Sequence, residues 1–127
     1  MAKITASAPV LLVKDIVQAA AYFRDKLGFI DQRLYGDPSD FAIIRRDGFT
    51  LMLSQVEADQ TVISNWRVVD KMWDAYFWVD DVEAIYAEFQ HSGATIDYTL
   101  YTTPWGVREF GVQDIDDHDI AFGQVIR

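Results

Sequence analysis

The first half of the chain contains several apolar runs and one stretch in which apolar residues recur at helical spacing. The run 9–13 predicts a buried strand, and Asp15 after it is a candidate helix N-cap. Apolar residues then recur at the spacing of one helix face as far as Leu27, and Gly28 predicts the C-cap. Further strands are predicted over 29–35, 41–45 and 49–55, with a turn over 36–40 and a hairpin at Asp47-Gly48.

The second half repeats this order of elements. A strand is predicted over 73–79, and Asp80 or Asp81 then caps a helix that Gly93 ends. The pattern then continues with a strand that has a break over 94–101 and a turn over 103–106. It ends with the two hairpin strands 107–114 and 119–125. The least patterned stretch, 56–71, is expected to carry a short helix or an excursion that holds Trp66. Each half is therefore predicted to be β-α-β-β-β.

The two halves also align residue by residue. The stretch 41–55 matches 110–124 without a gap at an offset of 110 − 41 = 69 positions, which places Gln55 on Gln124. We infer an internal repeat with a first module over 6–56, a second over 72–127 and a connector over 57–71. Since no linker rich in Gly or Pro separates the modules, we expect one domain over 1–127. A duplication of this size predicts a pseudo-symmetric fold with a ligand between the copies.

Composition narrows the classes of function. The chain has 127 residues, no Cys and a formal net charge of −9, from 20 acidic and 11 basic side chains. Disulfides and a Cys nucleophile are excluded, and we expect no nucleic-acid partner because phosphate contacts need clustered Lys and Arg. No apolar run is long enough to span a bilayer and the first residues lack a signal peptide, so a cytoplasmic protein is expected. The acidic surface either attracts cationic ligands or only keeps the protein soluble.

Several segments in order carry a family resemblance. They are Tyr-Phe-Arg-Asp-Lys-Leu-Gly-Phe at 22–29, Val-Asp-Asp-Val at 79–82 and Pro-Trp-Gly-Val-Arg-Glu-Phe at 104–110. With the hairpin 114–124, where Ile115 and Asp117 replace the usual Pro and Gly, they resemble the vicinal oxygen chelate (VOC) superfamily. This superfamily includes glyoxalases, extradiol dioxygenases, fosfomycin-resistance enzymes and bleomycin-resistance proteins. The resemblance implies an α+β fold in which two pseudo-symmetric βαβββ modules form a cup-shaped mixed sheet. The Pro-Trp-Gly segment is more typical of the bleomycin-resistance-like branch.

The same resemblance implies four points at which the metalloenzymes of the superfamily place ligands. They fall on Ala8, Met52, Asp74 and Ala121. Of these only Asp74 could bind a divalent metal, because such metals need imidazole or carboxylate ligands. We therefore expect no metal and no cofactor. His118, among acidic residues in the last hairpin turn, could in principle hold an ion, but a solvated turn is expected there.

Strand alternation selects the residues that would line the cup. In the strand 73–79, Phe77 and its odd-numbered neighbours are assigned to the helix side, so the even positions face the cup. In the first module, Met52 is assigned to the cup side of its strand. Core packing is the competing interpretation of the aromatic positions, and we accept it for Phe23, Phe89 and Phe122. The predicted ligand-binding residues are Met52, Trp66, Asp74, Tyr76, Trp78, Trp105, Glu109 and Gln113.

These residues predict a binding protein without catalytic residues. Indole and phenol rings stack on flat groups and attract cations, and carboxylates pair with amines. We expect a protein that resembles bleomycin-resistance proteins and sequesters a bulky cationic or aromatic small molecule, for example a bleomycin-like antibiotic. The resemblance implies a homodimer with exchanged modules. The alternatives are a metal-dependent enzyme of the glyoxalase/dioxygenase superfamily with relocated ligands, or a dimeric interaction module without a small ligand.

Overall fold

The computed structural model describes residues 1–126 and consists of two compact units. Unit 1 runs from Met1 to Val62, and unit 2 begins at Ile63. The boundary lies inside the connector predicted over 57–71. That the two units act together as one domain over 1–127 stays a prediction.

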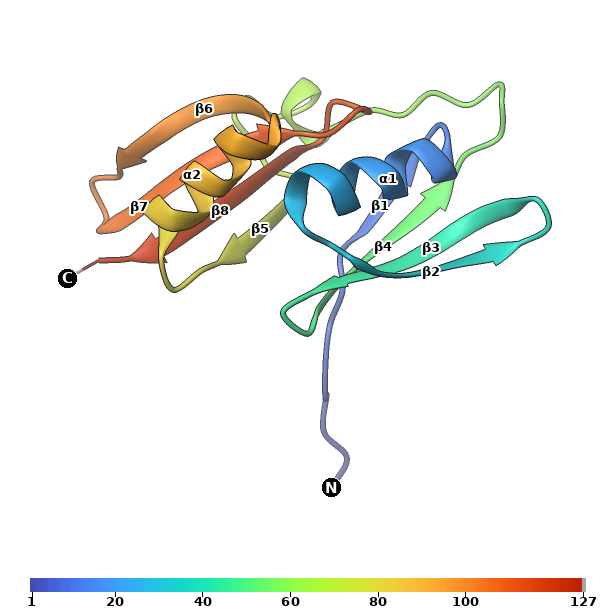
Figure 1. The fold of residues 1–127 in the computed structure, drawn as a ribbon, viewed down its shortest axis with the longest axis horizontal. Coiled ribbons are helices and arrows are strands. Elements are labelled where there is room, and N and C mark those ends of the chain that lie inside the picture. The colour runs from blue at the N-terminus through green and yellow to red at the C-terminus, as the bar shows by residue number, and fades with distance from the viewer. Residues whose placement is uncertain (127) are drawn as a thin grey trace. The chain divides into compact units, whose positions relative to one another are not determined.

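Unit 1 is a four-stranded sheet with one helix across it (Figure 1). The elements are β1 (Val10–Val13), α1 (Ile16–Leu27), β2 (Asp31–Gly36), β3 (Ser39–Arg46) and β4 (Phe49–Gln55). The strand order is β1-β4-β3-β2, with β1 parallel to β4 and the other pairs antiparallel. The predicted turn over 36–40 is shorter than expected, because Ser39 already pairs with Gly36.

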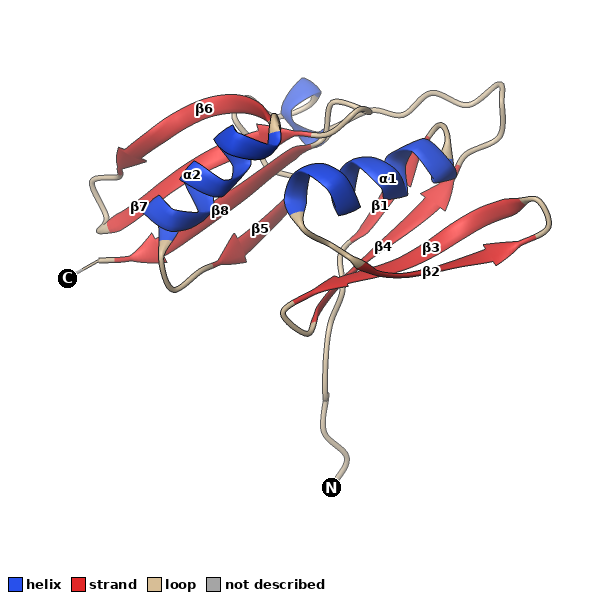
Figure 2. Cartoon of the chain, in the orientation of Figure 1, coloured by secondary structure: helices blue, strands red, loops and turns tan. Residues whose placement is uncertain are grey.

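Unit 2 repeats this arrangement (Figure 2). A short 3-10 helix, η1 (Asn65–Arg67), precedes β5 (Ala75–Trp78), α2 (Val82–Ser92), β6 (Thr95–Thr102), β7 (Val107–Gln113) and β8 (Asp119–Val125). The order β5-β8-β7-β6 matches that of unit 1, again with one parallel pair, β5 and β8. The predicted fold class, two βαβββ modules with mixed sheets, is confirmed, and so is a short helix that holds Trp66.

Both α-helices begin and end as the sequence predicts. The carboxylates of Asp15 and Asp81 each accept a hydrogen bond of 3.0 Å from a backbone N–H three residues further on. At the other end, Gly28 and Gly93 adopt the left-handed conformation in which glycine pays no steric penalty. The caps therefore fix where each helix leaves its sheet.

A second contact at the helix start is also duplicated. The side-chain amide oxygen of Gln55, at the end of β4, accepts a hydrogen bond of 2.8 Å from the N–H of Ile16. The side chain of Gln124, near the end of β8, does the same for Val82 at 2.9 Å. The repeat aligned these two glutamines with each other. The structure shows that each ties the first residue of its helix to the last strand of its own sheet.

The core of each unit lies between the helix and one face of the sheet. In unit 1 it is mostly aliphatic, with Phe23 and Phe29 in edge-to-face contact at 5.8 Å between ring centroids. In unit 2 it is aromatic: Phe122 on β8 stacks on Phe77 and Phe110 at 5.6 Å from each, and Phe89 of α2 packs against its edge. The phenylalanines predicted to be core are therefore on the helix side. The opposite face of each sheet carries a different set of side chains.

Candidate functional site

The middle of the unit 2 sheet, on the face turned away from α2, carries two rows of side chains. In sheet register, one row is Tyr76, Ala121, Gly111 and Tyr98, and the other is Trp78, Gly123, Glu109 and Tyr101. In these two rows the bulky residues stand on the outer strands β5 and β6, whereas the inner strands contribute Gly, Ala and one carboxylate. A neighbouring row on the same face, next to the β7–β8 turn, holds Gln113 and Asp119. We call Trp73, Tyr76, Trp78, Tyr98, Tyr101 and Glu109 the aromatic face.

Glu109 is the polar centre of the aromatic face. Its Oε1 accepts a hydrogen bond of 3.2 Å from the hydroxyl of Tyr76, and its Oε2 accepts one of 2.6 Å from the hydroxyl of Tyr98. The residue is only 2% exposed. Within residues 1–126 no Lys, Arg or His forms an ion pair with it. A buried carboxylate is normally compensated by a cation, so hydrogen bonds from phenols are the whole of its local compensation here.

Two glycines make this arrangement sterically feasible. A Cβ added to Gly123 would overlap the hydroxyl of Tyr76, and a Cβ added to Gly111 would overlap the ring of Tyr98. Neither glycine has a positive φ, so it is space and not backbone freedom that requires them. The two tyrosine rings therefore lie over the inner strands and reach Glu109 from opposite edges of the sheet.

Further rings continue this arrangement on both sides. The indole N–H of Trp73 donates a hydrogen bond of 3.0 Å to the hydroxyl of Tyr98. The ring of Tyr76 lies 4.8 Å from the rings of both Trp73 and Trp78. Trp78 is 63% exposed although it is a large aromatic side chain, and it presents indole surface next to the Tyr76–Glu109 contact. Exposed aromatic surface beside a buried carboxylate is suited to binding flat or cationic groups.

The surroundings of Tyr76 and Tyr98 keep their hydroxyls protonated, so both can donate hydrogen bonds. Burial, reinforced by the charge of Glu109 and by the hydrogen bond to it, raises the pKa of the Tyr76 hydroxyl well above its usual value. Burial and the hydrogen bond to Glu109 raise the pKa of Tyr98 further, although the Trp73 N–H acts in the opposite direction. Both phenols therefore remain protonated at physiological pH, as their donation to the carboxylate requires.

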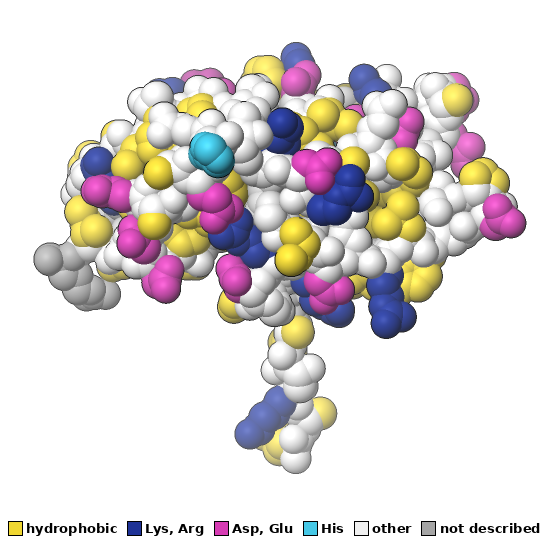
Figure 3. Space-filling model, in the orientation of Figure 1, with side chains coloured by type: hydrophobic (Ala, Val, Ile, Leu, Met, Phe, Trp, Pro, Cys, Tyr) yellow, Lys and Arg dark blue, Asp and Glu magenta, His cyan; other side chains and the backbone are white. Residues whose placement is uncertain are grey.

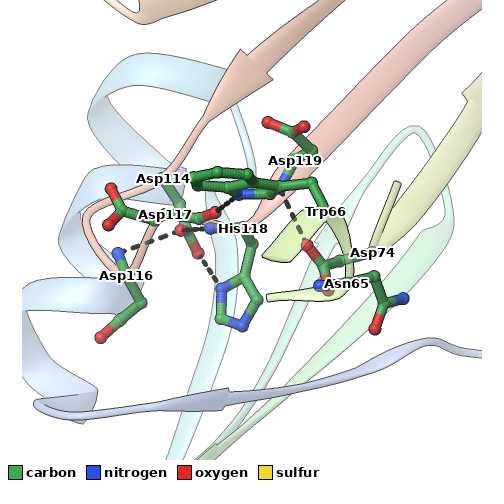
Figure 4. Close-up of polar contacts among 8 residues, drawn as sticks. All are labelled: Asn65, Trp66, Asp74, Asp114, Asp116, Asp117, His118 and Asp119. Carbon is green, nitrogen blue, oxygen red and sulfur yellow. Dashed lines mark hydrogen bonds and ion pairs between the residues drawn. The ribbon is translucent and has the colours of Figure 1, made fainter. Parts of the chain in front are cut away.

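Trp66 and Asp74 lie in a separate polar cluster (Figure 4). Asp74 accepts one backbone N–H from Asn65 through Oδ1 and one from Asp119 through Oδ2, each at 2.9 Å. The indole N–H of Trp66 donates to the backbone carbonyl of Asp117 at 2.6 Å. Arg67 Nη2 donates a hydrogen bond of 3.1 Å to Asp117 Oδ2. These contacts of Trp66 and Arg67 hold η1 against the β7–β8 turn. The predicted ligand residues Trp66 and Asp74 thus use their polar atoms within the protein.

Within the β7–β8 turn Asp114, Asp116 and His118 are buried, whereas Ile115 and Asp117 are exposed, so the expectation of a solvated turn is wrong for His118. His118 is 3% exposed. Asp114 Oδ1 accepts the backbone N–H groups of Asp116 and His118, and its Oδ2 lies 2.7 Å from His118 Nδ1. Burial lowers the pKa of His118, but the hydrogen bond to Asp114 and the charges of Asp114, Asp74 and Asp116 outweigh it, so the pKa is raised. The acidic residues around the imidazole therefore organise the turn and stabilise an imidazolium.

The other predicted residues occupy three different places. Gln113 donates a hydrogen bond to the carboxyl of Asp119, whose pKa burial and the nearby Asp97 raise to about 6. Trp105 is exposed in the turn between β6 and β7. Met52 lies in unit 1, on the face opposite α1. The structure thus places Tyr76, Trp78, Glu109 and Gln113 on one face of the unit 2 sheet, and it places Met52, Trp66 and Trp105 elsewhere.

Sequence reasoning missed Trp73, Tyr98 and Tyr101. The register of β6 against β7 shifts on both sides of Tyr98, between Ile96 and Tyr98 and again before Tyr101. Strict alternation therefore fails in this strand and could not assign its side chains to a face. The small residues at 111 and 123, opposite bulky ones, are the signal that could have located the tyrosines.

The donors at the four points of the superfamily's metal site do not fit a divalent metal. Ala8 and Ala121 have no donor atoms, Met52 offers only a soft thioether, and both oxygens of Asp74 accept backbone N–H groups. Within residues 1–126 no group of three or more His, Asp or Glu side chains is arranged to hold a metal ion.

On the face drawn in Figure 3, acidic and basic side chains are interspersed with apolar ones, and neither sign forms one large patch. No helix within residues 1–126 has the length and apolar character needed to cross a membrane.

Comparisons with known proteins identify relatives over almost the whole chain. The family model of the glyoxalase/bleomycin resistance protein/dioxygenase superfamily matches residues 5–122. No curated protein matches the sequence.

Solved structures show the same architecture. A glyoxalase-related enzyme from Clostridium phytofermentans superposes with a TM-score of 0.78 at 18% identity, covering 98% of each chain. TioX from Micromonospora sp. ML1 gives 0.70 at 21% identity, covering 96% of this chain and 98% of the other. The bleomycin-binding protein from bleomycin-producing Streptomyces verticillus, solved with copper(II)-bleomycin, gives 0.69 at 25% identity, covering 100% and 99%.

Proposed function

Because the chain belongs to the glyoxalase/bleomycin resistance protein/dioxygenase superfamily, we propose that it is a non-catalytic protein that binds and sequesters a small molecule. The expected ligand is bulky and is cationic or aromatic, as in bleomycin-resistance proteins. Similarity over the full chain to the bleomycin-binding protein from Streptomyces verticillus supports this proposal. So does the mismatch between the metal-ligand points and any divalent metal.

One observation carries the proposal. The aromatic face combines an exposed indole, Trp78, with a buried carboxylate, Glu109, that has no cationic partner within residues 1–126. Residues that only pack a core do not leave an indole 63% exposed. The same face holds no serine, cysteine or histidine placed as a nucleophile with a base. Stacking and charge attraction are the interactions that this set of residues offers.

We also propose a homodimer with exchanged modules. The face of unit 1 opposite α1 leaves apolar side chains in solvent, and Leu12 on β1 is 49% exposed. The residues before β1 form no helix or strand, and Ile4 among them is 92% exposed. Figure 1 shows this segment running away from β1. Apolar sheet surface of this kind favours association with a second copy.

Calorimetric titration of the purified protein with a bleomycin-type compound, followed by mass spectrometry of the recovered compound, tests the proposal. We expect saturable binding, quenching of tryptophan fluorescence and an unchanged compound mass. A compound that binds and returns chemically altered would favour the enzyme alternative. Elemental analysis of protein purified without chelator, together with melting curves after addition of Mn, Ni, Zn or Fe, gives a second test. A stoichiometric metal or a metal-dependent rise in Tm would contradict a protein without a metal.

A further inference from the structure

The charge of the aromatic face lies beneath its rings. Glu109 is 2% exposed, whereas Trp78 and Tyr101 stand in solvent at 63% and 44%. The rings of Tyr98 and Tyr101 are in edge contact at 6.0 Å between centroids, on the side of Glu109 away from Trp78. A molecule resting on this face would therefore touch ring surface, and the carboxylate would act on it from below.

The two tyrosines that contact Glu109 extend the effect of its charge to the surface. A phenol that donates a hydrogen bond to a carboxylate becomes more electron-rich, because hydrogen bonds in a poorly hydrated environment polarise their partners. Tyr76 and Tyr98 both donate to Glu109, and the 2.6 Å contact of Tyr98 is short, as charge-assisted hydrogen bonds are. The ring faces above a buried negative charge should thus attract cations more strongly than isolated aromatic rings do.

The same geometry disfavours strongly hydrated cations. A primary ammonium loses tightly held water on binding and needs acceptors that replace it. Each oxygen of Glu109 accepts one tyrosine hydroxyl, and the buried carboxylate is out of reach of a molecule on the surface, so an ammonium resting on this face cannot pair with it directly. A methylated or delocalised cation loses less hydration and is held well by ring faces.

We infer that the aromatic face selects weakly hydrated cations, such as quaternary ammonium groups or N-alkylated heteroaromatic rings, over primary ammonium groups and neutral rings. Glu109 supplies the charge through the rings of Tyr76 and Tyr98. This inference rests on the proposed function, since it names the chemical class that the proposed site would hold.

Three matched probes test the selectivity at neutral pH on the 127-residue chain. Benzyltrimethylammonium, benzylammonium and benzyl alcohol share one ring and differ in charge and hydration. Dissociation constants are obtained by NMR titration of the Trp78 indole signal. We expect the quaternary probe to bind about tenfold more tightly than either of the others. Equal affinity for all three, or preference for benzylammonium, would overturn the inference while leaving small-molecule binding at this face intact.

Two variants locate the source of the selectivity. Glu109→Gln keeps a hydrogen-bonding side chain and removes the charge, so the quaternary probe should bind no better than benzyl alcohol. Glu57→Gln makes the same change in net charge at an exposed residue of unit 1 and should leave the ratio unaltered. Selectivity that survives Glu109→Gln would overturn the role of Glu109. Failure of all three probes, with no binding of larger aromatic compounds, would overturn the proposed function itself. Because the wild-type ratios need no variant, the test holds even if Glu109→Gln does not fold.

Discussion

The hydroxyl of Tyr98 donates a hydrogen bond of 2.6 Å to Oε2 of Glu109, across the two strands β6 and β7. Tyr98 also accepts the indole N–H of Trp73, so one phenol joins an indole to a buried carboxylate. A hydrogen-bonded chain of polar groups around a buried carboxylate is costly to build and is stable only when every member is satisfied. This relationship makes the aromatic face both a stability element and a candidate site.

Tyr98→Phe should therefore be destabilising. The substitution removes a donor from Glu109 and an acceptor from Trp73, and it leaves the carboxylate with one hydrogen bond from Tyr76. We expect a loss of about 2 kcal/mol in the free energy of unfolding, measured by urea titration. Tyr35→Phe, at a partly exposed tyrosine of unit 1, is the matched control and should change the free energy of unfolding by less than about 0.5 kcal/mol. Equal effects of the two substitutions would show that the Glu109 contact contributes nothing.

A methyl group at position 123 should act through Tyr76. In Gly123→Ala the new Cβ would occupy the space of the Tyr76 hydroxyl, so the ring must move away from Glu109. We expect a destabilisation of about 1–3 kcal/mol, the range for overpacking, and weaker ligand binding at the aromatic face. Removing the hydroxyl in the double variant Gly123→Ala/Tyr76→Phe should restore part of the stability. Thermal melts of both variants measure this, and a double variant less stable than Gly123→Ala would contradict the steric account.

The sequence predicted the frame of both units because the frame depends on local signals. Helix caps at Asp15 and Asp81 and the αL glycines that end the helices act within a few residues. Alternation assigned Tyr76 and Trp78 to the correct face because β5 pairs with β8 without a register shift. The same rule failed in β6, where the shifts around Tyr98 break the alternation.

Contacts between distant segments could not be predicted in this way. The alignment of Gln55 with Gln124 indicated a shared role, but not that each side chain reaches a helix N-terminus. Asp74 was predicted to bind ligand because alternation placed it on the cup side of its strand. Its carboxylate instead accepts hydrogen bonds from backbone N–H groups of η1 and β8. The N–H groups that reach a given carboxylate are set by the tertiary structure. The residue pattern along one strand does not contain this information.

The duplicated glutamines allow a paired test. Gln55→Ala and Gln124→Ala each remove the side-chain acceptor of a helix's first N–H, while the Asp caps remain. We expect each to lower the free energy of unfolding by about 1 kcal/mol, the usual contribution of one such hydrogen bond. Gln90→Ala, at an exposed position of α2, serves as the control in chemical denaturation. If neither substitution differs from the control, the helix N-termini do not depend on the glutamines.

The Asp114–His118 pair should make stability depend on pH. The folded-state pKa of His118 is raised above the reference value of about 6.5, because Asp114 favours the imidazolium. The stabilisation is therefore fully present below about pH 6.5 and is lost as the pH rises through the folded-state pKa. Asp114→Asn removes the negative charge beside His118, so the pKa of His118 should fall. The loss of stability with rising pH that comes from this pair should then disappear.

NMR titration of the His118 ring signal measures that shift directly. The chain has only two histidines, so the spectrum contains one other ring, that of exposed His91 at the end of α2. Melting temperatures across the same pH range give the linked change in stability. A His118 titration that is the same in wild type and Asp114→Asn would show that the 2.7 Å contact does not hold the proton.

The exposed apolar face of unit 1 gives a test of association. Leu12 on β1 is flanked in register by Ser54 of β4, so a charge placed there would stand on the sheet face and not in the core. Burial of such a charge at an interface is costly, and Leu12→Glu should therefore weaken a dimer that uses this face. Light scattering coupled to size exclusion would then show a monomer for the variant at concentrations where the wild type is dimeric. Val17→Glu, at an exposed position on α1 outside this sheet face, is the control and should remain dimeric. A wild-type protein that is monomeric at all concentrations would contradict the proposed exchange of modules, and a dimer that tolerates Leu12→Glu would place the interface on another surface.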